Sequence, residues 1–291
     1  MIARLMGLLA CALLAAAAAP LHAQSSLLDQ GRTAMARGDV DGAITSLEKA
    51  VAQSPKSAAA HYSLATAYGA KAQGGNMLNA LSYGPKMKSE LETAVALDPK
   101  HAEARFALVE LYAVAPPAMG GSPDKALSQA AEIKRLDPIL GHRAFAFVYA
   151  RQDKLDLARR EYLDAIREQP GSAKAHTYFG MHLASREKNN AAAFAEFNAA
   201  LKADPTYMPA HYYLGRTAAL GDTNLAAGAA SLKKYLAYRP RETEPPIAMA
   251  YYYQGLVYEK QGDKAAAVQS YNAALAINPT LKQASDALKR L

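Results

Sequence analysis

The 291-residue chain is 51% hydrophobic and 20% charged, a balance typical of a folded protein and unlike the polar, charge-rich composition of disordered chains. Its formal net charge of +7 permits an acidic partner, but the 33 Lys and Arg residues are spread along the chain and never form a run of five. Because a surface that follows nucleic-acid phosphates needs clustered basic residues, the composition disfavours nucleic acid as the partner.

Residues 1–23 have the layout of a secretory signal peptide. Arg4 precedes an apolar stretch over residues 5–19, and the segment ends on the small residue Ala23. The stretch is short for a membrane-spanning helix. We therefore expect cleavage after Ala23 and a periplasmic protein with no membrane span after cleavage. The Leu-Leu-Ala-Cys sequence that ends at Cys11 also resembles a bacterial lipobox, so a lipid anchor on Cys11 is the alternative.

From residue 24 onward the chain repeats a pattern about 34 residues long. A proline closes each copy, at intervals of 32 to 44 residues: Pro55, Pro99, Pro138, Pro170, Pro205, Pro240 and Pro279. Eight residues before it stands a mostly large side chain: Leu47, Leu91, Ala130, Tyr162, Phe197, Leu232 and Tyr271. Three positions after this large residue stands a mostly small residue, and four positions before it stands another. These offsets place all three on one helical face, so the pattern predicts a helix that ends before each proline.

Each copy also predicts an earlier helix with its own small residue at the point of closest contact. These residues are Gly31, Ala65, Val109, Ala146, Gly180, Gly215 and Gly255. Small residues let two helices approach closely, and the large residues of the later helix fill the groove beside them. Gly38-Asp39 and Gly262-Asp263 mark a tight turn between the two helices.

This spacing of Gly, small residue, aromatic, Ala and Pro resembles the tetratricopeptide repeat family. The resemblance covers almost all of the chain after the leader and implies an all-α fold, a right-handed superhelical solenoid. About seven helix-turn-helix repeats are expected, at residues 24–57, 58–101, 102–138, 139–172, 173–207, 208–247 and 248–279. Residues 280–291 form an amphipathic pattern with a charged outer face, which predicts a C-terminal capping helix.

Three insertions interrupt the repeat, at residues 72–85, 115–126 and 238–246. The first two contain Gly74-Gly75 and Gly120-Gly121. Insertions at equivalent points of successive repeats lie on the same edge of a solenoid, often beside the binding face. A Gly-Gly pair before a helix can present free backbone N–H groups to an anion. The alternative, which we favour, is that both pairs are ordinary turns that need a positive φ.

Four histidines share the fourth position of the first helix in their repeats: His61, His142, His176 and His211. One per repeat leaves them about 10 Å apart, too far to share an ion with bonds of about 2 Å. We interpret them as packing residues. No metalloprotease, nucleophile-elbow or dinucleotide motif is present, so the sequence predicts no enzyme, no metal site and no cofactor.

In the resembled family the inward-facing side chains come chiefly from set positions of the first helices. Carried over to this sequence, they imply a concave binding groove that includes Arg32, Tyr62, Phe106, Glu110, Arg143, Tyr178, Tyr212, Arg216 and Tyr252. Aromatic side chains supply contact area at little entropic cost, and Arg binds carboxylates. The alternative is that several of these tyrosines pack between repeats.

These observations predict a non-catalytic scaffold or adaptor of the bacterial cell envelope that binds a protein or peptide partner in the groove. The Lys and Asn clamp with which some members of the family hold chaperone C-termini does not occur at these positions. Self-association through the ends of the solenoid is a further option. The alternative function is a periplasmic small-ligand carrier or transport accessory protein whose Gly-Gly loops close a pocket.

Overall fold

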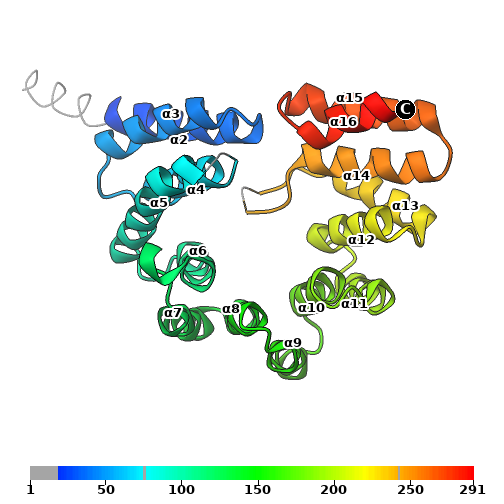
Figure 1. The fold of residues 1–291 in the computed structure, drawn as a ribbon, viewed down its shortest axis with the longest axis horizontal. Coiled ribbons are helices and arrows are strands. Elements are labelled where there is room, and N and C mark those ends of the chain that lie inside the picture. The colour runs from blue at the N-terminus through cyan, green and yellow to red at the C-terminus, as the bar shows by residue number, and fades with distance from the viewer. Residues whose placement is uncertain (1–18, 75–76, 242) are drawn as a thin grey trace, which may run out of the picture. The chain divides into compact units, whose positions relative to one another are not determined.

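The computed structural model describes residues 19–74, 77–241 and 243–291, and over these residues the chain consists of α-helices joined by short connections (Figure 1). No strand occurs in this described part. The predicted all-α repeat fold is therefore confirmed. Most of the predicted signal peptide, with Cys11 and the lipobox, lies outside the described residues.

The chain divides into two compact units. The N-terminal unit comprises residues up to 35 and residues 39–104, and the C-terminal unit comprises residues 36–38 and 105–291. Helices of the N-terminal unit are α2 (Ala19–Ala36), α3 (Val40–Gln53), α4 (Ala58–Gln73) and α5 (Met77–Leu97). Helix α6 (Ala102–Val114) begins at the boundary.

The C-terminal unit continues with a short 3-10 helix, η1 (Pro117–Met119), and then with paired α-helices. They are α7 (Pro123–Leu136), α8 (Pro138–Arg151), α9 (Leu155–Glu168), α10 (Ala173–Ser185), α11 (Asn190–Ala203), α12 (Met208–Gly221), α13 (Leu225–Leu236), α14 (Ile247–Lys260), α15 (Lys264–Ile277) and α16 (Lys282–Arg290). The first helices α8, α10, α12 and α14 lie side by side in one layer, and each packs on the second helix that follows it (Figure 1).

Short polar side chains define where many helices begin. Asp137, Ser172 and Asp263 each accept a hydrogen bond from the backbone N–H three residues ahead, at 3.0 to 3.2 Å. Such caps satisfy donors that the first turn of a helix leaves free. Pro138 follows Asp137 as the first residue of α8, where its missing N–H costs nothing. One repeat therefore ends and the next begins with almost no linker.

The small and large residues predicted to meet do meet in the structure. A Cβ on Gly180 would lie 2.6 Å from the ring of Phe197, and one on Gly215 would lie 2.3 Å from Leu232. Phe197 and Leu232 are fully buried. The two helices of a repeat approach so closely that only glycine fits at these points.

Adding one methyl group at such a contact should destabilise the fold. We expect Gly255→Ala to lower the free energy of unfolding by about 1–3 kcal/mol, although alanine favours a helix by about 1 kcal/mol. The new Cβ would lie 2.4 Å from Cε1 of Tyr271, whose ring is fully buried. Gly171→Ala is the matched control, because nothing lies within 4 Å of its added Cβ. Equal urea midpoints for the two variants would contradict the close-approach explanation.

The first insertion folds differently from a loop. Helix α5 has 21 residues where most second helices have 14, so from Met77 onward the inserted residues extend the helix at its N-terminal end. Pro85 lies inside this helix. Gly74 caps α4 with a φ of −80°, so the favoured interpretation of a positive φ is wrong at this residue, and Gly75 lies outside the described residues.

The second insertion agrees with the turn interpretation. Gly120 has a φ of 89° and ends η1, and such a conformation favours glycine. A Cβ on Gly121 would lie 1.7 Å from the carbonyl oxygen of Ala115. Both glycines are thus required by the backbone path of this loop.

The described helices differ from membrane-spanning helices in length and hydropathy. None of them is both long enough and apolar enough to cross a bilayer.

Candidate functional site

Aromatic and arginine side chains gather on the first helices of the C-terminal unit. We call Phe106, Arg143, Tyr178, Tyr213 and Arg216, which come from α6, α8, α10 and α12, the aromatic–arginine face. Helices α8, α10 and α12 lie side by side, and the Phe106 ring of α6 lies 6.3 Å from the Phe147 ring of α8, so the repeat brings side chains at corresponding positions close together. This face contains several of the residues predicted from the sequence.

Arg143 lies between two aromatic rings. Its guanidinium carbon is 4.3 Å from the ring centre of Phe106 and 4.5 Å from that of Tyr178. Both distances fit cation–π contacts. No described carboxylate lies within the 4.0 Å of an ion pair with Arg143. The rings therefore hold the guanidinium in place while leaving its N–H donors available to a ligand.

The groups around Arg143 keep its guanidinium protonated. Burial alone would lower the pKa of Arg143, but Tyr178, Tyr162, Tyr213 and Glu110 together raise it. Burial raises the pKa of Glu110, and the charge of Arg143 offsets part of that effect. The charge of Arg143 therefore stabilises the carboxylate of Glu110, although the two side chains form no ion pair.

A pocket of about 460 Å³ lies at the other end of this face. It is lined by Met181, Ser185, Tyr212, Tyr213, Arg216, Thr243, Glu244, Pro245 and Pro246. The last four residues belong to the third insertion. The Tyr235 hydroxyl donates a hydrogen bond to the Pro245 carbonyl at 2.5 Å, and the Arg241 backbone N–H donates to Glu244 at 2.8 Å. These bonds fix one wall of the pocket.

The predicted groove residues separate into four groups. Phe106, Glu110, Arg143 and Tyr178 come together around the guanidinium of Arg143. Arg216 lies at the pocket, where its Nε donates to the Tyr253 hydroxyl at 3.1 Å.

Two predicted tyrosines of the C-terminal unit pack against other tyrosine rings. Tyr212 is 5% exposed, and its ring centre lies 5.1 to 5.8 Å from those of Tyr213, Tyr235 and Tyr253. Tyr252 packs on Tyr271, with ring centres 6.0 Å apart. The contact of Tyr212 with Tyr253 matches the alternative of packing between repeats, whereas the contact of Tyr252 with Tyr271 lies within one repeat.

The remaining two predicted residues belong to the N-terminal unit. Arg32 Nε donates to the Ser63 hydroxyl at 3.4 Å, and the Tyr62 ring lies 4.8 Å from that of His101. Their role in binding stays a prediction.

Three of the four repeated histidines pair with a glutamate on the second helix of their own repeat. The pairs are His61–Glu90, His142–Glu161 and His176–Glu196, with Nδ1 to Oε2 distances of 2.5, 2.8 and 2.7 Å. Sequence reasoning missed these pairs, although the glutamate follows its histidine by 19 or 20 residues, or by 29 where the first insertion intervenes. No group of three or more potential metal-ligating residues occurs in the described chain.

The fourth histidine has a different environment. His211 is buried, its Nε2 faces the Pro205 carbonyl at 3.1 Å, and its Nδ1 has no hydrogen-bond partner in the described part of the chain. Burial lowers the pKa of His211, the Pro205 carbonyl raises it in part, and Lys234 lowers it further. The folded protein therefore favours the neutral ring.

This pKa shift predicts a loss of stability in acid. As pH falls through the ordinary histidine pKa of 6.5, the unfolded chain binds a proton at His211 that the folded chain resists, so the free energy of unfolding decreases. Between pH 7.5 and 5.5 the contribution of this one residue is at most about 1.4 kcal/mol. We expect His211→Gln to lose less stability than the wild type over this range, measured by urea unfolding. Equal losses would mean that His211 titrates alike in both states.

Three segments of the chain match family profiles. Residues 31–71 match a profile described as TPR repeat, and residues 144–207 and 248–281 match profiles described as tetratricopeptide repeat. These three segments are tetratricopeptide repeats. The matched segment 144–207 includes the first helix α10, which carries Tyr178, Met181 and Ser185. No curated protein matches the chain in sequence.

Several solved structures are similar to this chain. Human IFIT1, described as a dimer with PPP-AAAA, is 20% identical, with 87% of this chain and 59% of that chain covered and a TM-score of 0.52. A tetratricopeptide repeat protein from Parabacteroides merdae is 16% identical over 92% of this chain and 98% of that chain, with a TM-score of 0.48. YrrB, described as a TPR protein with an unusual peptide-binding site, is 17% identical over 68% of this chain and 97% of that chain, with a TM-score of 0.45. At such identities the likeness is one of fold.

Proposed function

We propose that the protein is a non-catalytic interaction scaffold that binds an extended segment of a partner protein on the aromatic–arginine face. The observation that carries the proposal is the guanidinium of Arg143, held between Phe106 and Tyr178 without a paired carboxylate. Membership of a family whose repeats generally act as interaction modules supports it.

The chemistry of the face indicates what such a segment contains. An acidic side chain or a terminal carboxylate can accept two parallel hydrogen bonds from a guanidinium. Because the rings already order Arg143, binding loses little side-chain entropy there. Apolar side chains of the partner can then pack on the exposed parts of Tyr178 and Tyr213, which are only partly buried. We therefore expect the partner segment to combine a carboxylate with apolar residues.

A peptide-display selection on the immobilised full chain tests this proposal. Peptides enriched on the wild type should carry Asp, Glu or a free C-terminal carboxylate beside apolar residues, and Arg143→Gln should enrich them poorly. Arg160→Gln is a matched control, because Arg160 is exposed on α9, a second helix. Enrichment that is the same on all three proteins, or that shows no preference for carboxylates, would overturn the proposal.

We also propose that the protein acts in the cell envelope, after export by residues 1–23. The support is the pattern of Arg4, the apolar stretch and Ala23 in the sequence. Fractionation of cells that express the full chain should place it in the periplasm with a new N-terminus at Gln24. If Cys11→Ser moves the protein from the membrane to the soluble fraction, the lipid anchor is the correct alternative. An uncleaved cytoplasmic product would contradict export by either route.

The pocket beside Arg216 favours the small-ligand carrier as a second candidate. Its volume of about 460 Å³ lies within the range typical of small-ligand sites, and its walls combine Tyr212, Pro245 and Pro246 with polar groups. One wall of this pocket is formed by the third insertion, and neither Gly-Gly loop lines the pocket. Native mass spectrometry of the purified protein should then show a bound small molecule that Arg216→Ala fails to retain. A wild-type spectrum with the apo mass alone would argue against the carrier.

A further inference from the structure

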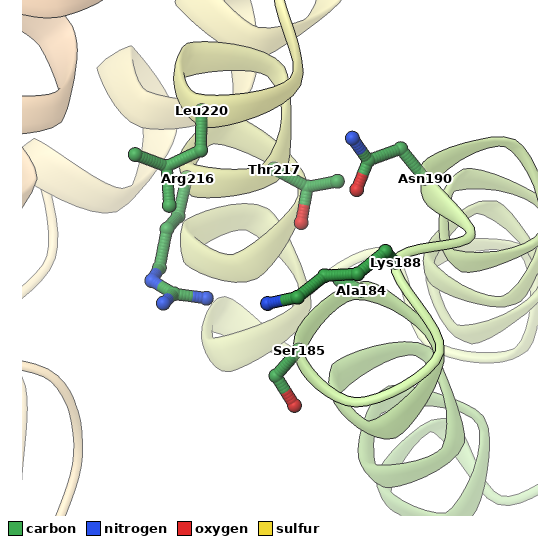
Figure 2. A pocket seen from close by; sticks show the side chains of 7 residues that line it. All are labelled: Ala184, Ser185, Lys188, Asn190, Arg216, Thr217 and Leu220. Carbon is green, nitrogen blue, oxygen red and sulfur yellow. The ribbon is translucent and has the colours of Figure 1, made fainter.

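We propose that a second, smaller pocket, beside Arg216 and the α10–α11 turn, is an oxyanion site that takes a phosphate group. The pocket has a volume of about 250 Å³ and is lined by Ala184, Ser185, Lys188, Asn190, Arg216, Thr217 and Leu220. Figure 2 shows the ammonium of Lys188 and the guanidinium of Arg216 pointing into the same space. The proposal goes beyond peptide binding and does not depend on it.

The pocket holds two cations and no carboxylate. Neither Lys188 nor Arg216 forms an ion pair with a described residue. Glu187, the neighbour of Lys188 in sequence, pairs instead with Arg159 at 2.8 Å. Two positive charges that face one another without a counter-ion repel each other. A bound anion would remove this repulsion.

Arg216 keeps donors free for such an anion. Its Nε donates to the Tyr253 hydroxyl, and its guanidinium carbon lies 5.7 Å from the ring centre of Tyr253. This contact orients the guanidinium but uses one of its five N–H donors, so the two terminal amino groups remain. Lys188 adds three donors.

The backbone at Lys188 shows that this side chain is an unfavourable choice for its turn. In four of the turns between the two helices of a repeat, the residue two positions before the second helix has a positive φ: Gly38, Asp153, Lys188 and Gly262, with φ of 77°, 60°, 56° and 83°. Glycine adopts this conformation freely and Asp tolerates it, whereas a long side chain there is strained. Such strain is more common where a side chain serves a ligand.

A comparison with the next repeat shows how the acidic residues of these turns are used. In the α12–α13 turn Asp222 lies 3.6 Å from Lys260 near the end of α14. Glu187 stands at the corresponding place in the α10–α11 turn, eleven residues after the fourth position of its first helix, and it pairs with Arg159 of α9. Among the described residues, the ion pairs of these two turns therefore leave Lys188 without an acidic partner.

The donors favour phosphate over a carboxylate. Lys188 and Arg216 together supply two positive charges and several N–H groups, and Thr217 and Asn190 line the same pocket with a hydroxyl and an amide. A phosphate carries up to two negative charges and presents at least three acceptor oxygens, whereas a carboxylate carries one charge and two oxygens. The number and charge of the donors match the phosphate.

Titration of the full chain with inorganic phosphate at low salt, followed by amide NMR, tests the site. We expect saturable shifts at residues 184–190 and 216–220, and at least a tenfold weaker affinity in Lys188→Gln. Lys202→Gln, which removes an exposed charge from α11, should bind as the wild type does. Equal weakening in both variants would overturn the proposal, because it would show a general charge effect. Saturation by acetate at the same concentration would overturn the assignment to phosphate.

Lys188→Gly separates a binding role from a structural one. Relief of the positive φ should raise the thermal midpoint of the ligand-free protein, while phosphate affinity falls at least tenfold. A variant that binds phosphate like the wild type would refute the role of Lys188. Binding of selected peptides through Arg143 should stay unchanged in Lys188→Gly, so failure of one proposal does not decide the other.

Discussion

Replacement of Phe197 by alanine is expected to lower the free energy of unfolding by about 3–5 kcal/mol. The ring is fully buried on α11, it fills the space above Gly180 of the same repeat, and its centre lies 6.4 Å from that of Tyr213 in the next repeat. One side chain therefore joins the two helices of a repeat and one repeat to the next. Its loss leaves a cavity that the surrounding helices can close only in part.

Urea unfolding followed by helical circular dichroism measures this effect. Phe197→Leu retains most of the volume and should cost less than about 1.5 kcal/mol. Leu163→Ala is the control, since Leu163 is 46% exposed on α9, and it should change stability by no more than about 0.5 kcal/mol. A loss below 1 kcal/mol in Phe197→Ala would contradict the packing described for these repeats.

Replacement of Arg143 by glutamine should weaken the binding of a selected acidic peptide about 30-fold, which corresponds to about 2 kcal/mol. The substitution removes the charge and the bidentate donor but leaves a polar side chain between Phe106 and Tyr178. The partner carboxylate then loses its charged hydrogen bonds within a partly desolvated site. Calorimetric titration of the same peptide into wild type and variant gives the ratio.

Variants of Tyr178 test whether the aromatic sandwich matters in itself. Tyr178→Phe retains the ring and should bind within about threefold of the wild type, whereas Tyr178→Ala removes one wall and should weaken binding roughly tenfold. Arg160→Gln on α9 should bind like the wild type. If Arg160→Gln weakens peptide binding as much as Arg143→Gln does, the net charge of the protein explains the affinity and the site around Arg143 does not.

Much of the fold could be predicted because its signal recurs. Gly180 and Phe197, or Gly255 and Tyr271, stand 16 or 17 residues apart in their own repeats, and each pair meets in the structure. Because the same spacing occurs in successive repeats, it predicts the same contact in each of them. The prolines between repeats indicate where each second helix ends.

The insertions have no such repetition, and the prediction was weaker there. Residues from Met77 onward were assigned to an insertion between helices, but they form the first part of α5. Pro85 lies within that helix, although proline usually interrupts one. The two residues before Met77 lie outside the described part of the chain.

The candidate site was predicted in part, because the direction of a side chain on a helix depends on its neighbours in three dimensions. Phe106, Arg143 and Tyr178 were identified from their positions in the first helices. Tyr212, at an equivalent position, is buried by Tyr235 and Tyr253. Lys188 was missed, because the turn that holds it shows its positive φ only in the structure.

The most direct test of the account is to map where a selected peptide binds. Amide NMR of the full chain with that peptide should show its largest shifts on the first helices α6, α8, α10 and α12, around Arg143, and no comparable shifts on α9, α11 and α13. Arg143→Gln should remove these shifts at the same peptide concentration. Shifts centred on the second helices, or a map that Arg143→Gln leaves unaltered, would contradict the assignment of binding to the aromatic–arginine face.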